Sequence, residues 1–224
     1  MIQWCSRQLE EYQRVNCRAG KQGKRPLTKW QNPPSGRLKI NINGAFRVND
    51  GCGGIGVVVR DHEGKGIAAM ARPFLHAHSA LSMEAEACRA GLLLGIHQGW
   101  ADIDIESDST TLIAALKSEE ENLSEVSRIL DDCKEYFSSF RSVRILHTYR
   151  EANGVADRLA HLASVVTIDD VWLDETPAII QDVLYEDYCH CFSVARGSGF
   201  MSPPMQNSTF NKINGTGRGV EPPS

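Results

Sequence analysis

No acidic residue occurs between Tyr12 and Asn49, although the chain as a whole has 28 Asp and Glu against 24 Lys and Arg. A stretch with charges of one sign attracts phosphate groups, so this segment is a candidate for contact with nucleic acid. A solvated linker explains the same composition equally well. The basic residues of the stretch are Arg14, Arg18, Lys21, Lys24, Arg25, Lys29, Arg37, Lys39 and Arg47.

The chain also lacks a long apolar run, an apolar leader and paired cysteines. No stretch reaches the roughly 18 apolar residues that span a bilayer, and residues 1–13 contain no apolar segment of the signal-peptide kind. The seven cysteines are odd in number and scattered, so we expect reduced thiols, no membrane association and a nuclear or cytoplasmic location rather than secretion. Cys189-His190-Cys191 is a weak metal motif, because no second ligand pair lies at a zinc-like spacing.

Composition and hydropathy divide the chain into four parts. Residues 1–36 form a basic, polar N-terminal arm, and residues 37–168 carry all the strong hydrophobic periodicity. Residues 169–192 can pack as a C-terminal appendage. Residues 193–224 are rich in Gly, Pro, Ser and Asn and are predicted to be disordered. The central part is long enough for one hydrophobic core, and we expect a monomer.

Within the central part, the order of the predicted elements indicates an α/β fold. Strands are predicted at 38–46, 102–108 and 142–149, with a hairpin at 53–73; helices are predicted at 79–100, 109–118, 123–140 and 153–165. Ser79 or Ser82 can cap the first helix, and Gly99 can end it. This order predicts a mixed five-stranded sheet flanked by helices, in which an antiparallel meander is followed by crossover units.

Three acidic residues stand out against this background. Glu84 lies at the edge of the packed face of its helix, where a carboxylate without a basic partner needs a hydrogen bond or a cation. Asp108 follows a strand and precedes a helix, which also suits an N-cap. Asp157 lies in the first turn of the last helix, where it also complements the helix dipole. The elements that carry them converge at the carboxyl edge of one sheet, where α/β folds place their sites.

Four segments in this order and spacing resemble the type-1 ribonuclease H domain, in particular its plant, retrotransposon-derived branch that is associated with reverse transcriptases. The segments read KINING from Lys39, SMEAEACRAGLLL from Ser82, IDIESDSTTLI from Ile103 and HTYREANGVADRLAHLA from His147. The lead-in from Trp30 to Asn41 matches the same branch. The resemblance covers about residues 30–170.

The resemblance implies an endonuclease, a hydrolase that cleaves the RNA strand of RNA–DNA hybrids with four carboxylates and two Mg²⁺ ions, with Mn²⁺ as a substitute. Mg²⁺ prefers hard oxygen ligands, and two ions can activate water and stabilise the leaving oxygen. By motif, Glu84, Asp108 and Asp157 match three of the metal ligands, and His147 matches a mobile histidine that carries protons. The nucleic-acid contacts that we expect are Lys21, Lys24, Arg25, Lys29 and Asn153.

The first acid of the family is missing, because Asn43 occupies its position before Gly44. An amide oxygen can coordinate one cation, but it carries no charge and bridges two ions poorly. Asp50 is too distant in sequence to substitute. We therefore expect weakened metal binding and reduced or lost hydrolysis. The alternative is a catalytically silent module that binds hybrid or double-stranded nucleic acid, and a third interpretation is a structural remnant without a nucleic-acid role.

Overall fold

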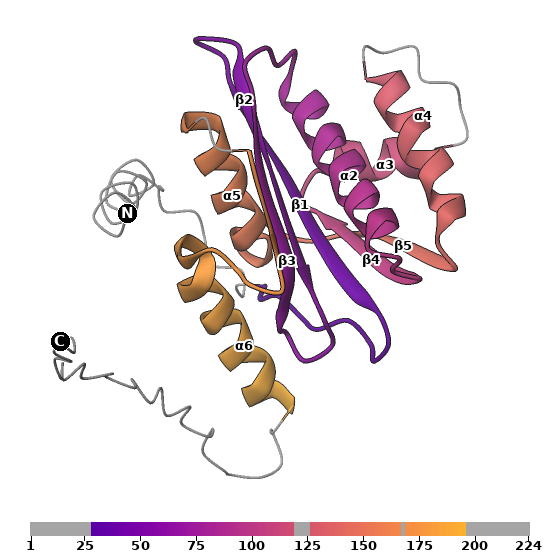
Figure 1. Ribbon diagram of the computed structural model, residues 1–224, viewed down its shortest axis with the longest axis vertical. Helices are drawn as coiled ribbons and strands as arrows, with labels where there is room; N and C mark the ends of the chain where they lie inside the picture. The colour runs from indigo at the N-terminus through magenta and orange to yellow at the C-terminus, as the bar shows by residue number, and fades with distance from the viewer. Residues whose placement is uncertain (1–27, 119–125, 167–168, 196–224) are drawn as a thin grey trace, which may run out of the picture.

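The computed structural model of the protein describes residues 28–118, 126–166 and 169–195 (Figure 1). Its centre is a six-stranded sheet in the order β5-β4-β1-β2-β3-β6. Strands β1, β2 and β3 form an antiparallel meander, whereas β4 runs parallel to both β1 and β5. The strands are β1 (Leu38–Arg47), β2 (Cys52–Arg60), β3 (Gly66–Phe74), β4 (Asp102–Ser107), β5 (Ser142–His147) and β6 (Asp170–Leu173). The predicted α/β architecture is confirmed.

Helices cover both faces of the sheet (Figure 1). They are α2 (Ala80–His97), α3 (Thr110–Lys117), α4 (Ser127–Tyr136), α5 (Gly154–Val165) and α6 (Gln181–Ala195). One apolar cluster packs α2, α3 and α4 against the sheet, and a second packs α5 against β2 and β3 on the other face. Among the residues that the structure describes, no helix is long and apolar enough to cross a membrane.

Local sequence signals explain how α2 begins and ends. The Ser79 side chain accepts a hydrogen bond from the Ser82 backbone N–H, and the Ser82 hydroxyl oxygen accepts one from the Ser79 N–H. This reciprocal capping box satisfies two backbone donors at the helix start and identifies Ser79 as the N-cap. Gly99 follows the helix with a φ of +68°, a left-handed conformation that favours glycine.

Two glycines of the meander bring helices close to the strand that contains Asn43. A Cβ atom on Gly44 would lie 2.3 Å from the backbone of Met83 and Glu84 in α2. Gly56 is the register partner of Asn43, and a Cβ atom there would lie 2.2 Å from the Ala156 carbonyl oxygen in α5. Because only glycine permits these approaches, α2 and α5 converge on β1 from opposite faces at Asn43.

The expected count of five strands was wrong, because the sheet gains a sixth strand from the C-terminal appendage. Strand β6 pairs antiparallel with β3, from Ala68 opposite Leu173 to Ala71 opposite Asp170. Without β6, the β3 edge would leave a row of backbone donors and acceptors unpaired. A strand this short carries too little alternation to be distinguished in sequence from a packed loop.

Candidate functional site

The site is built around a hydrogen bond between Asn43 in β1 and Asp157 in the first turn of α5. Asn43 Nδ2 donates to Asp157 Oδ1 at 2.9 Å, and Asn43 Oδ1 accepts the Gly44 backbone N–H at 2.9 Å. Asn43 is 5% exposed. Both ends of the amide are therefore occupied by groups of the protein, and its nitrogen, not its oxygen, faces the neighbouring carboxylate.

Glu84 lies on the α2 side of this pair, next to the close approach at Gly44. It accepts a hydrogen bond from Ser107 Oγ at 3.3 Å. Burial raises the pKa of Glu84 to about 8, and the nearby Asp108 and Asp157 carboxylates reinforce this rise, while hydrogen bonds from Gly44 and Ser107 oppose it. Asp108 and Asp157 are thus close enough to oppose ionisation of Glu84, and the Glu84 carboxyl group is held mostly protonated at neutral pH.

Asp108 is not the N-cap of α3, because that position belongs to Ser109, whose side chain accepts the Leu112 N–H. The Asp108 carboxylate instead accepts Asn153 Nδ2 at 3.0 Å. The same nitrogen donates to the carbonyl oxygen of Ile42 at 2.9 Å. Asn153 therefore links Asp108 to β1, the strand that contains Asn43. This link holds the Asp108 carboxylate beside the candidate site.

Asn153 was predicted to contact nucleic acid, but the structure gives it an internal position. Its side chain is 0% exposed, and both hydrogen bonds of its amide nitrogen end within the protein. A fully buried amide cannot reach a phosphate or a base without opening the fold. Lys29 lies within the described residues, whereas Lys21, Lys24 and Arg25 lie outside them.

His147 lies at the same edge of the sheet, at the end of β5. It is the register partner of Ser107, the residue before Asp108. His147 is exposed, and its ring meets the Tyr149 ring edge-on with centroids 5.6 Å apart. This places an exposed imidazole at the rim of the site, and its role as a proton carrier stays a prediction.

Two contacts of Asp157 were missed in the sequence. Arg150 donates to Asp157 Oδ1 at 3.0 Å, and His161 Nε2 lies 3.6 Å from the same oxygen. The helical i, i+4 spacing could have identified His161, but Arg150 approaches through a short 3-10 turn that has no sequence signature. Asp157 Oδ1 thus accepts hydrogen bonds from Asn43 and Arg150, and His161 lies close to the same oxygen.

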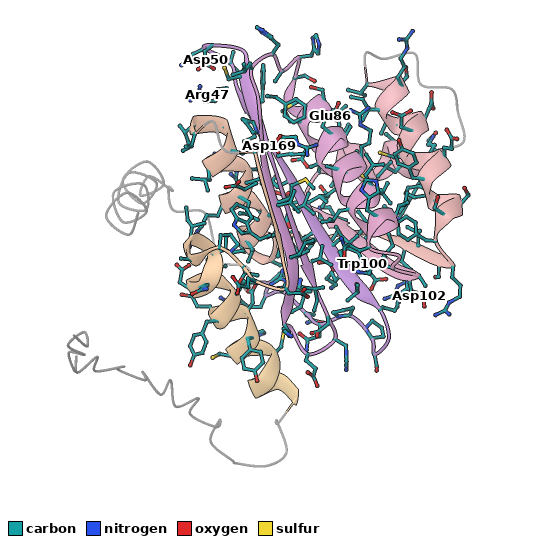
Figure 2. All side chains as sticks on the ribbon, in the orientation of Figure 1. Arg47, Asp50, Glu86, Trp100, Asp102 and Asp169 are labelled. Carbon is teal, nitrogen blue, oxygen red and sulfur yellow. The ribbon has the colours of Figure 1, made fainter. Side chains whose placement is uncertain are left out.

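Asp50 does not replace the missing acid. Figure 2 shows it beside Arg47 at the far end of the β1–β2 hairpin, and the two side chains form an ion pair. Its carboxylate also accepts the Cys52 backbone N–H at 3.1 Å, and this bond holds the pKa of Asp50 below its usual range. The Asp50 carboxylate therefore stabilises the β1–β2 turn and takes no part in the candidate site.

The residues present do not fit the two-ion site that the resemblance implies. Among the described residues, no three acidic, histidine or cysteine side chains form a group that could hold a metal ion. The Asn43 amide turns a donor toward Asp157, where a bridging ligand would need an oxygen.

Comparison with known proteins identifies the family to which the central part of the chain is similar. A family model described as reverse transcriptase-like matches residues 41–163. An Arabidopsis thaliana protein, named provisionally as a ribonuclease H protein, is 29% identical over 162 residues, which cover 70% of this chain and 25% of that protein. The chain therefore spans about a quarter of that relative's length.

Solved structures with the same fold include an archaeal ribonuclease H1 and a ribonuclease H1 isolated from compost. Ribonuclease H1 of the halophilic archaeon Halobacterium salinarum is 25% identical with a TM-score of 0.54, covering 57% of this chain and 96% of its own. LC11 ribonuclease H1 in complex with an RNA/DNA hybrid is 20% identical with a TM-score of 0.51, covering 57% of this chain and 96% of its own. The second likeness shows the fold alone.

Proposed function

This chain belongs to the reverse transcriptase-like family, and from that premise we propose that it is a ribonuclease H-like domain that binds RNA–DNA hybrids but hydrolyses their RNA strand weakly. The observation that carries the second half of this proposal is the hydrogen bond from Asn43 Nδ2 to Asp157 Oδ1, 2.9 Å long. It places a neutral donor where hydrolysis of this type requires a carboxylate.

The arrangement of the remaining acids supports a nucleic-acid site of this type. Glu84, Asp108 and Asp157 come from three different parts of the chain and meet at one edge of the sheet, where burial and the two aspartates raise the pKa of Glu84. A strongly raised carboxyl pKa of this kind is typical of functional sites. The solved structure of LC11 ribonuclease H1 with an RNA/DNA hybrid indicates the substrate class that this fold accommodates.

The neutral amide has a calculable consequence for the reaction. A unit charge about 4 Å from another charge contributes about 4 kcal/mol at an effective dielectric near 20. Loss of that interaction in the transition state lowers the rate about a thousandfold. Under this proposal Glu84, Asp108 and Asp157 would hold Mg²⁺ or Mn²⁺ only weakly, and the exposed His147 at the rim would carry protons to solvent.

The test is cleavage of a labelled RNA–DNA hybrid by the wild-type chain and Asn43→Asp, in Mg²⁺ and in Mn²⁺. We expect Asn43→Asp to cleave about a thousandfold faster than wild type. Asn49→Asp adds the same charge at an exposed position of the β1–β2 turn and should leave the rate unchanged. Equal, robust cleavage by wild type and Asn43→Asp would refute the limiting role of Asn43.

Binding is tested separately by fluorescence anisotropy of the same hybrid in EDTA. We expect salt-sensitive binding by wild type and by Asn43→Asp, since phosphate contacts dominate affinity and weaken as salt rises. Removal of residues 1–27 tests whether Lys21, Lys24 and Arg25 contribute. Binding without cleavage by either protein identifies the silent module, and absence of both activities identifies the structural remnant.

A further inference from the structure

The C-terminal helix α6 reaches the sheet through a buried ion pair. Arg60 NH1 at the end of β2 donates to Asp187 Oδ2 in α6 at 2.7 Å. Arg60 is 1% exposed and Asp187 is 6% exposed. Helix α6 lies outside residues 41–163, the range that the reverse transcriptase-like family model matches, so this contact joins the matched domain to an element beyond it.

The same guanidinium group continues the contact into the sheet. Arg60 NH2 donates to Asn41 Oδ1 at 2.9 Å, and Trp30 Nε1 donates to that same oxygen at 2.9 Å. The Trp30 ring lies 3.6 Å from the guanidinium carbon. Because two donors converge on Asn41 Oδ1, the orientation of the Asn41 amide is determined, and its nitrogen must point the other way.

The Asn41 nitrogen points to the residue that holds Asp108. Asn41 Nδ2 donates to Asn153 Oδ1 at 3.3 Å and to Glu106 Oε2 at 3.0 Å. Asn153 Nδ2 donates in turn to Asp108 Oδ1 at 3.0 Å. Asn41 and Asn153 are both 0% exposed. A continuous chain of side-chain hydrogen bonds therefore runs from α6 to the acid at the site.

Resting on the proposed function, we propose that Asp187 is a positioning residue of that site, which acts through Arg60, Asn41 and Asn153 to hold the Asp108 carboxylate in place. Arg60 Nε has no hydrogen-bond partner within the described residues, so the guanidinium group is oriented by its two terminal nitrogens. Loss of the Asp187 charge frees one of them. Arg60 then turns toward a new acceptor and leaves Asn41 Oδ1 with Trp30 as its remaining donor, so that the Asn41 amide, and with it Asn153, shifts.

The alternative is that α6 only supports the fold by covering α5 and β3. A second ion pair on the same helix separates the two interpretations. Asp182 pairs with Arg158 of α5, and Arg158 also donates to the Ile179 carbonyl oxygen at 2.9 Å. This pair docks α6 onto α5 and includes no residue of the hydrogen-bond chain. Asp182→Asn is therefore the matched control for Asp187→Asn.

The first measurement needs no activity. In the full-length chain labelled with ¹⁵N, the side-chain amide signals of Asn41 and Asn153 report their hydrogen bonds. We expect Asp187→Asn to shift both signals and Asp182→Asn to leave both in place. Asp187→Glu keeps the charge and should restore the signals in part. Unshifted Asn41 and Asn153 signals in folded Asp187→Asn, or equal shifts in the control, overturn the proposal.

A buried arginine without its partner can unfold the protein, so a second variant removes both charges. Arg60→Met combined with Asp187→Leu leaves no unpaired charge and still breaks the contact with Asn41. We expect a folded protein with shifted Asn153 signals. If this double variant folds and the Asn153 signals stay in place, the proposal is refuted.

The second measurement is hybrid cleavage in the Asn43→Asp background. We expect Asp187→Asn to lower kcat about tenfold with little change in KM, since a displaced group near the reacting atoms lowers the rate more than binding. Asp182→Asn should change neither constant, and equal loss in both variants overturns the proposal. If Asn43→Asp itself does not cleave the hybrid, the proposed function fails. The Asn41 and Asn153 amide signals then still decide whether Asp187 positions Asn153 through the hydrogen-bond chain.

Discussion

Asn43 and Asp157 share one hydrogen bond of 2.9 Å across the sheet face, from the amide nitrogen of one to the carboxylate oxygen of the other. Arg150 donates to the same oxygen at 3.0 Å. The native site is therefore partly neutralised by groups of the protein itself. Asn43 stabilises Asp157 in the protein without a metal ion. Under the proposed function, the same side chain stands where a metal ligand is needed, so a change at position 43 should affect stability and activity in opposite directions.

Asn43→Asp should destabilise the ion-free protein. The change replaces a donor with a second carboxylate at hydrogen-bond distance from Asp157, and we expect the free energy of unfolding to fall by roughly 2 kcal/mol. Urea unfolding in EDTA measures this loss. Addition of Mg²⁺ should recover more stability in Asn43→Asp than in wild type, because a ligand stabilises the state that binds it. Identical Mg²⁺ responses in the two proteins would contradict the prediction.

The raised pKa of Glu84 predicts a stability that falls as pH rises. The unfolded chain releases this proton near the ordinary value of 4.5, whereas the folded protein retains it up to about 8. Between these values the unfolded state binds fewer protons, so the free energy of unfolding decreases as pH rises, by about 1.4 kcal/mol for each pH unit. Denaturant unfolding in EDTA should show this slope in wild type and lose it in Glu84→Gln. If the free energy of unfolding of wild type and of Glu84→Gln depended on pH in the same way, a raised pKa of Glu84 would be excluded.

Asn153→Ala should be strongly destabilising. It removes hydrogen bonds to the Ile42 carbonyl oxygen and Asp108 and takes an acceptor from the buried Asn41 amide, at about 1–3 kcal/mol for each buried group affected. Asn32 is the control, because it is exposed and its amide donates to the His62 carbonyl oxygen at 2.8 Å. Asn32→Ala should lower the unfolding free energy by less than about 1 kcal/mol. Comparable losses in the two variants would argue against the internal role of Asn153.

Gly44→Ala should displace α2. The added Cβ would lie 2.3 Å from the Met83 and Glu84 backbone, so the helix must move, at about 3 kcal/mol in stability. Gly154→Ala is the matched change in α5, where the nearest atom is Val183 Cγ1 at 3.7 Å. It should be neutral or stabilise the protein by up to about 1 kcal/mol. Thermal unfolding of both variants provides the comparison, and a tolerated Gly44→Ala would show that α2 can shift freely.

Much of the fold could be read from local pattern. The β-branched run of β2, the Ser79 cap and the Gly99 stop each act over a few residues, and the structure has them where the sequence predicted. Strand β6 was not predicted, because its pairing with β3 depends on the free edge of a strand about a hundred residues earlier. Such a partner leaves no local trace.

The sequence by itself determined which chemical groups the candidate site contains: three carboxylates, a histidine, and an asparagine where the resemblance predicts the first acid. Only the tertiary structure decided what that asparagine does, because the direction of its amide depends on the Gly44 N–H and on Asp157 from another element. The same holds for Asn153, which the resemblance predicted to contact nucleic acid and which the structure buries, with its amide donating to Asp108. Hydrogen-bond direction and burial are set by neighbours distant in the chain, and these are the properties that residue identity alone does not specify.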